Sequence, residues 1–165
     1  MSLNSLPMQL SFKDVFAALP GSSRVWVFSS DRPLTEVEGL MAKRALAEFV
    51  SRWAAHGKKL SALGDILLDR FVVLSVDEST AGASGCSIDS SVHFLKELGN
   101  QLNVDLFNRM KLYVLQGDEI IRIHIADLPT YKDALLFDPL ISDLEDFRTN
   151  FLIPVESSLL YKQFA

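Results

Sequence analysis

Residues 71–91 read F-V-V-L-S-V-D-E-S-T-A-G-A-S-G-C-S-I-D-S-S. The run rich in β-branched residues at positions 71–76 predicts a strand, and apolar residues at helical spacing from Ile88 onward predict a helix. The loop between them holds two acids, two glycines, several hydroxyl side chains and the only cysteine of the chain. This composition presents polar groups between a strand and a helix, so the loop is the first candidate for a functional site.

Apolar runs and capped amphipathic segments alternate on both sides of this loop. The predicted elements are a strand at residues 24–29, a helix at 35–55, strands at 60–68 and 71–76, a helix from about residue 86 to 102, and a strand at 110–115. This β-α-β-β-α-β order is typical of a ferredoxin-like split βαβ unit, in which two helices cover one face of an antiparallel sheet. We therefore predict a single α+β domain over residues 1–165 with a ferredoxin-like core.

The longest predicted helix begins at a capping box formed by Thr35 and Glu38. We expect it to end at His56 and Gly57, because a glycine followed by lysines is typical of a helix C-terminus. Seven residues at helical spacing give this helix a broad apolar face: Val37, Leu40, Met41, Leu46, Phe49, Val50 and Trp53.

Further elements are predicted outside the core. Residues 120–125 read as an added strand that forms a hairpin with the preceding strand. An S-x-x-D capping box predicts a short N-terminal helix at residues 11–19. A C-terminal helix is predicted to start with Asp138 as its cap and Pro139 at its first position, and to end at Pro154.

The composition excludes several classes of protein. A net charge of −5, with 21 acids against 16 lysines and arginines, speaks against a nucleic-acid partner. No apolar run is long enough to predict a membrane span. Residues 1–9 lack the features of a secretory signal, and one cysteine fits a reducing compartment. We therefore expect a cytoplasmic protein.

The predicted topology brings distant residues together. The first helix ends at the sheet end where the second strand begins, the third strand finishes there, and the second helix starts there. His56, Asp77, Glu78 and the loop at residues 84–89 should therefore converge at one end of the sheet. This convergence defines the candidate site.

A thiol mechanism is one interpretation of that site. Cys86 would be the nucleophile, since a helix N-terminus favours thiolate. His56 would be its base, oriented by Asp77 or Glu78. The alternative, which we prefer because free cysteines are commonly buried, is that Cys86 is a small residue packed beneath the helix.

Ligand binding is the other interpretation. Ser84, Gly85 and Ser87 can offer backbone and hydroxyl groups to an anion at the helix start, and Asp89 lies beside them. The same serines can instead cap their own helix, and the two interpretations carry equal weight. Ligand spacings such as H-x-x-x-H or C-x-x-C are absent, so no metal and no cofactor are predicted.

Three motifs carry a resemblance to a family of short bacterial proteins commonly labelled "ABC transporter ATPase": W-A-A-H-G-K-K-L at residues 53–60, V-D-E at 76–78, and A-S-G-C-S-I-D at 83–89. The resemblance covers most of the chain, and the third motif is its most specific part. The label implies nucleotide hydrolysis, which needs a Walker A loop, G-x-x-x-x-G-K-[ST]. The only Gly-Lys pair, Gly57-Lys58, is followed by Lys59, and the L-S-G-G-Q signature is absent. The resemblance therefore implies no catalytic residue.

Three functions remain, in order of preference. The first is a module that binds a small ligand or anion, or a protein, through the loop at residues 77–89 and His56. The second is a thiol-dependent enzyme with Cys86 as its nucleophile. The third, a nucleotide hydrolase, is least favoured. A homodimer is compatible with all three.

Overall fold

The computed structural model describes residues 10–164; residues 1–9, on which the signal prediction rests, and residue 165 lie outside the described part. The described chain divides into two compact units. The helix–sheet unit comprises residues 16–108 and 142–145, and the terminal unit comprises residues 10–15, 109–141 and 146–164. The single domain over residues 1–165 stays a prediction.

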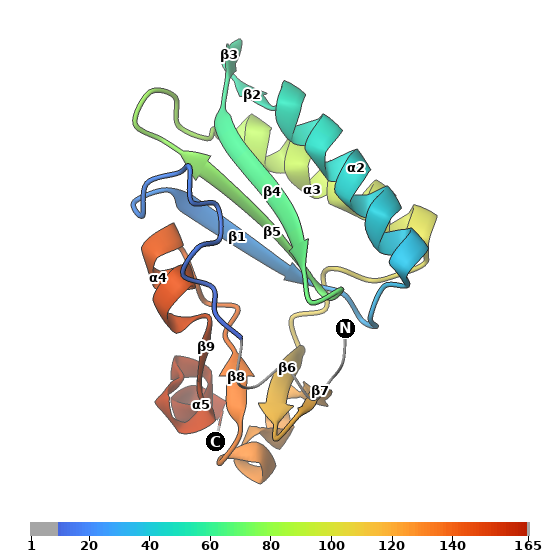
Figure 1. Ribbon diagram of the computed structural model, residues 1–165, viewed down its shortest axis with the longest axis vertical. Coiled ribbons are helices and arrows are strands. Elements are labelled where there is room, and N and C mark those ends of the chain that lie inside the picture. The colour runs from blue at the N-terminus through green and yellow to red at the C-terminus, as the bar shows by residue number, and fades with distance from the viewer. Residues whose placement is uncertain (1–9, 165) are drawn as a thin grey trace. The chain divides into compact units, whose positions relative to one another are not determined.

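The helix–sheet unit is a three-stranded antiparallel sheet, ordered β1-β5-β4, with two long helices on one face (Figure 1). Its elements are β1 (Arg24–Ser29), α2 (Glu36–Arg52), β2 (Ala54–Ala55), β3 (Lys58–Lys59), β4 (Ser61–Leu67), β5 (Phe71–Asp77) and α3 (Gly85–Leu102). Both outer strands run antiparallel to β5 and therefore parallel to each other. A parallel pair needs a crossover, which α2 supplies.

The core of this unit lies between the sheet and the two helices. Leu46 of α2, Leu74 of β5 and Leu95 of α3 are fully buried there. Gly64 of β4 lets α2 approach closely, because an added Cβ would lie 2.9 Å from Cγ of Leu46. Pairing of β4 with β5 continues without interruption through Gly64 and Leu74. The absence of a side chain at Gly64 therefore serves helix packing.

The predicted α+β class is confirmed, but the ferredoxin-like topology is not. That topology places the last strand of the core beside β1, whereas β6 (Lys111–Gln116) lies in a second sheet ordered β7-β6-β8-β9. Another segment occupies part of the outer edge of β1: the amide of Val25 donates to the carbonyl of Ser142 at 3.0 Å, and the amide of Leu144 donates to the carbonyl of Ser23 at 2.8 Å. The β-α-β-β-α order is confirmed, and the sixth element pairs elsewhere.

The terminal unit is built on that second, four-stranded antiparallel sheet. Its further elements are β7 (Glu119–His124), η2 (Ile125–Tyr131), β8 (Leu135–Phe137), α4 (Leu144–Asn150), β9 (Leu152–Pro154), η3 (Val155–Ser157) and α5 (Leu159–Phe164), with the first residues of α4 contributed by the helix–sheet unit. The predicted hairpin is confirmed, since Gln116 pairs with Glu119 across a two-residue turn. Apolar side chains from β6, η2 and α5, including Val114, Leu128 and Leu160, form its core.

The predicted N-terminal helix at residues 11–19 does not form, and the predicted C-terminal helix is wrong in its bounds. Residues 13–18 form turns in place of a helix, and Phe16 has a left-handed φ of 51° that interrupts helical hydrogen bonding. The predicted C-terminal helix begins only at Leu144. The carboxylate of Asp138 accepts a hydrogen bond from the amide of Leu140 at 2.9 Å, so Asp138 forms a local turn and caps no helix.

Tertiary contacts explain why the N-terminal segment does not fold as its local pattern predicts. Phe12 packs edge-on against Phe147 and Phe151, with ring centroids 5.7 and 5.1 Å away. Nε of Arg148 donates a 3.0 Å hydrogen bond to the carbonyl of Val15. These contacts hold the backbone of residues 13–18 in turns, and a capping box alone is a weak signal against them. None of the helices within residues 10–164 is long and apolar enough to cross a membrane.

Candidate functional site

One end of the helix–sheet unit gathers the segments that the topology predicts there. The indole Nε1 of Trp53, just after α2, donates a 2.8 Å hydrogen bond to the carbonyl of Ser87 in the first turn of α3. Asp77, the last residue of β5, pairs with Ser61, which is separated from the β2–β3 hairpin by a single residue. The β2–β3 hairpin, which contains His56, and the start of α3, which contains Cys86, therefore lie at the same end of the sheet.

The position of His56 differs from the prediction. The helix α2 begins as expected, with the Thr35–Glu38 capping box, but ends at Arg52. His56 and Gly57 form the turn between β2 and β3, with φ values of 51° and 77°. Positive φ at both central residues is what a type I′ hairpin turn requires, and glycine adopts it readily. His56 is thus an exposed hairpin residue and not a helix cap.

Asp77 and Glu78 organise the loop that follows β5. A carboxylate oxygen of Asp77 accepts the amide of Ser79 at 3.0 Å, and one of Glu78 accepts the amide of Ala83 at 2.8 Å. Each acid therefore satisfies a backbone donor of its own loop. Such side-chain hydrogen bonds to nearby amides stabilise turns.

The hydroxyls at the start of α3 also bond within their own segment. Ser84 and Ser87 form a reciprocal capping box, with amide-to-hydroxyl distances of 3.1 and 2.7 Å. Ser87 is buried, while Gly85 and Asp89 are exposed. The donors that an anion would need at Ala83, Ser84 and Ser87 are therefore already bonded. This arrangement agrees with the interpretation in which the serines cap their own helix.

Cys86 is exposed, so the preferred expectation of a buried, packed cysteine is wrong. Cys86 is the second residue of α3 and is exposed, whereas the next residue, Ser87, is buried. In the described part of the chain, no hydrogen bond links Cys86, His56, Asp77 and Glu78 to one another, and no group of three or more His, Cys, Asp or Glu side chains could hold a metal ion. A nucleophile–base–orienter chain is not assembled in this structure.

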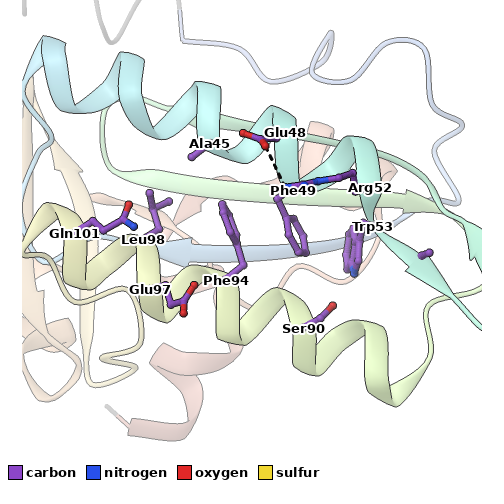
Figure 2. A pocket seen from close by; sticks show the side chains of 11 residues that line it. Ala45, Glu48, Phe49, Arg52, Trp53, Ser90, Phe94, Glu97, Leu98 and Gln101 are labelled. Atoms are coloured by element: carbon purple, nitrogen blue, oxygen red, sulfur yellow. Dashed lines mark ion pairs between the residues drawn. The ribbon is translucent and has the colours of Figure 1, made fainter.

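Sequence reasoning missed a groove between α2 and α3 (Figure 2). Its volume is about 480 Å³, within the range of ligand sites in proteins. Its lining comes from α2, α3 and the start of the hairpin: Ala45, Glu48, Phe49, Arg52, Trp53, Ala54, Ser90, Phe94, Glu97, Leu98 and Gln101. None of the residues predicted for catalysis or ligand binding contributes to it.

The groove has an aromatic floor and charged rims. The rings of Phe49 and Phe94 stack with centroids 4.5 Å apart, and Phe49 also meets Trp53 at 5.4 Å (Figure 2). On one rim Arg52 pairs with Glu48 at 3.1 Å. On the other, His93 lies 3.2 Å from Glu97. Both rim pairs are exposed, so they rearrange at little cost.

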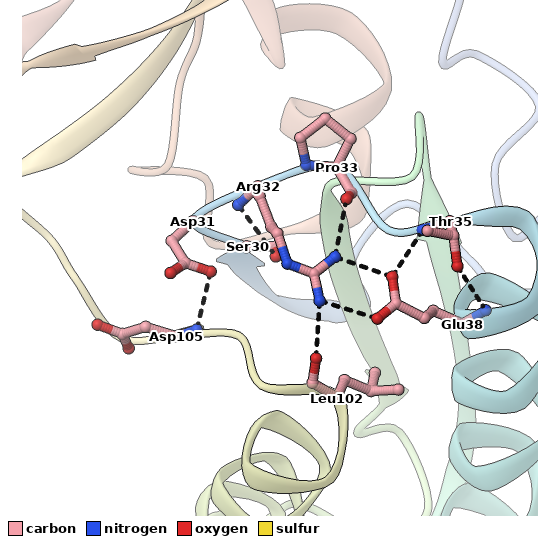
Figure 3. A network of polar contacts seen from close by, with 8 residues as sticks. All are labelled: Ser30, Asp31, Arg32, Pro33, Thr35, Glu38, Leu102 and Asp105. Atoms are coloured by element: carbon pink, nitrogen blue, oxygen red, sulfur yellow. Dashed lines mark hydrogen bonds and ion pairs between the residues drawn. The ribbon is translucent and has the colours of Figure 1, made fainter.

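Hydrogen bonds hold the two helices together at both ends of the groove. At one end Trp53 bonds to Ser87. At the other, Arg32 donates to both carboxylate oxygens of Glu38 in α2, at 2.8 Å each, and to the carbonyl of Leu102 in α3 at 2.8 Å (Figure 3). This guanidinium lowers the pKa of Glu38 to about 2. The hydrogen bonds at both ends therefore fix the spacing of α2 and α3 along the groove.

The exposed face of α2 is the second feature that the sequence did not reveal. Val37, Leu40 and Met41 were grouped with the apolar face, yet they are 66%, 64% and 58% exposed. The positions that face the sheet in this half of the helix are instead the small residues Gly39 and Ala42. Gly39 and Ala42 are the feature of the sequence that could have indicated the buried face, because small residues let a helix approach a sheet closely.

Comparison of the chain with protein-family models, with curated proteins and with solved structures gives no match.

Proposed function

We propose that this protein is a binding module without catalytic chemistry, and that its ligand is a short amphipathic helix of a protein partner seated between α2 and α3. The observation that carries the proposal is the groove itself, with an aromatic floor and ends fixed by hydrogen bonds. A site that is formed before binding loses little conformational entropy when its ligand arrives.

The dimensions and charges of the groove favour a helix as the occupant. Its lining on α3 runs from Ser90 to Gln101, about 16 Å at the rise of an α-helix, which matches about three helical turns. The apolar floor suits anchors spaced i, i+3 and i+4 in the partner. Rims with charges of both signs, Glu48 and Arg52 on α2 and Glu97 on α3, suit the flanking charged positions of a third packed helix.

The two other interpretations have weaker support. Anion binding at residues 82–87 would compete with the internal hydrogen bonds of Ser84, Ser87 and Glu78. Thiol chemistry at Cys86 would need a base within hydrogen-bond reach, and among residues 10–164 no hydrogen bond joins the Cys86 thiol to the imidazole of His56, which lies in the β2–β3 turn. We therefore keep protein binding as the preferred function, but we place the binding site in the groove and not in the loop at residues 77–89.

A displayed library of amphipathic helical peptides, selected against the full chain, tests the proposal. We expect peptides that bind wild type and lose at least tenfold in affinity against Ala45→Arg, which places a long cation in the groove. Ala47→Arg is the matched control, because Ala47 is exposed on the same helix and outside the lining. Selected peptides that bind both variants equally, or a selection that returns none, would overturn the groove as the binding site.

A further inference from the structure

We propose that a second copy of this chain packs on the exposed face of α2, with the two α2 helices antiparallel about a two-fold axis. The inference rests on residues outside the groove lining and does not depend on the proposed function. It concerns the apolar stripe formed by Val37, Leu40 and Met41 and the charged residues that flank it.

The apolar stripe has the spacing of a helix–helix seam. Val37, Leu40 and Met41, followed by Arg44, fall at i, i+3, i+4 and i+7. Three large apolar side chains, each more than half exposed, are thus contiguous on one helix face. Contiguous exposed apolar residues rimmed by charge mark interaction surfaces more often than isolated ones do.

Unpaired charges at the two ends of the stripe identify the partner. Glu36 and Arg44 are both exposed, and neither takes part in an ion pair among residues 10–164. They lie on opposite ends of the stripe and carry opposite charge. Other charges on α2 are already engaged, since Glu38 pairs with Arg32 and Lys43 with Asp65. Glu36 and Arg44 are therefore both available to a partner surface that carries the same two charges in the opposite order.

Two-fold symmetry makes a second copy that partner. An axis between Leu40 and Met41 places Leu40 against the partner's Met41, and places Val37 beside the partner's Arg44. It also brings Arg44 within reach of the partner's Glu36, and the same contact recurs on the other side of the axis, as an isologous interface requires. A parallel arrangement would place Arg44 against the partner's Arg44 and Glu36 against the partner's Glu36, which is repulsive. The charges therefore select the antiparallel pair.

The experiment measures the mass of the full chain by sedimentation velocity across a concentration series. We expect wild type to form a dimer at the upper end of the series. Leu40→Lys should remain monomeric throughout, while its circular dichroism and unfolding temperature stay those of wild type, because Leu40 is 64% exposed. Leu159→Lys is the matched control, since Leu159 is 66% exposed in the terminal unit, and this variant should dimerise as wild type does.

A charge exchange tests the antiparallel arrangement itself. Glu36→Lys and Arg44→Glu should each raise the dimer dissociation constant by about tenfold, and the double variant should restore it, because the two charges then meet again in reversed order. A wild type that stays monomeric, a Leu40→Lys variant that still dimerises, or a double variant weaker than either single variant would each overturn the proposal.

Discussion

The indole Nε1–H of Trp53 donates a 2.8 Å hydrogen bond to the carbonyl oxygen of Ser87, and this contact joins the end of α2 to the start of α3. Trp53 is 2% exposed, so the bond is shielded from water. The same ring forms one end of the groove floor through its contact with Phe49. Trp53 therefore contributes both to the stability of the unit and to the shape of the groove.

Trp53→Phe is expected to lower the free energy of unfolding by about 1–3 kcal/mol, because it removes a buried hydrogen bond and part of a packed ring. Trp26→Phe is the matched control. Trp26 also contacts Trp53 edge-on, at 5.8 Å, but it is only half-buried and its indole makes no hydrogen bond among the described residues. Denaturant unfolding of both variants provides the measurement. Equal losses would show that the hydrogen bond contributes nothing beyond ring packing.

Replacing glycine by alanine should have opposite effects at two positions of the helix–sheet unit. Gly64→Ala should destabilise by about 1–3 kcal/mol, because the new Cβ would lie 2.9 Å from Cγ of Leu46. Gly39→Ala should stabilise by about 0.5–1 kcal/mol, because its Cβ meets only Asp69 at 3.8 Å and alanine favours the helix. Thermal unfolding gives both values, and a stabilising Gly64→Ala would refute the close packing of α2 on β4.

The pair formed by Arg32 and Glu38 should make stability depend on pH. Hydrogen bonding to the guanidinium lowers the pKa of Glu38 from 4.5 to about 2, so the ionised form is favoured in the folded state. The stabilisation is present above the unfolded pKa and is lost as pH falls from about 4.5 toward 2.

Glu38→Gln isolates this effect, because glutamine can still accept the amide of Thr35 in the capping box but carries no charge. The denaturation midpoint of wild type should fall further than that of Glu38→Gln between pH 6 and pH 3. Parallel pH profiles for the two proteins would contradict the assignment.

Exposure of Cys86 leads to a prediction about its chemistry. The native protein should react completely with a disulfide reagent such as dithionitrobenzoate, without prior unfolding. Cys86→Ser should leave the unfolding temperature unchanged, since it removes no buried contact. A thiol that reacts only in denaturant would mean that the side chain is covered in solution.

Local signals predicted the elements that depend on neighbouring residues. The Thr35–Glu38 box gave the start of α2 because both partners lie within one helical turn. Capping of α3 by its own serines was one of two interpretations for the same reason, and the structure shows a reciprocal capping box of Ser84 and Ser87. The hairpin between β6 and β7 followed from a glycine-containing turn between two apolar runs.

Contacts between distant residues decided what the sequence could not predict. Val37, Leu40 and Met41 share the spacing of core residues, and only the closeness of Gly39 and Ala42 to the sheet turns them outward. The pairing of β6 with β7 and β8 is likewise a choice between sheet edges that no local pattern encodes. The groove likewise depends on contacts between distant residues, because α2 and α3 both line it and are far apart in the sequence.

Amide chemical shifts of the labelled full chain, titrated with a helical peptide from the display selection, test the central claim most directly. We predict shifts concentrated in residues 45–54 of α2 and the hairpin and in residues 90–101 of α3, the two segments that line the groove. Shifts concentrated in the loop at residues 77–89, with the groove segments unchanged, would contradict the account and return the site to the loop.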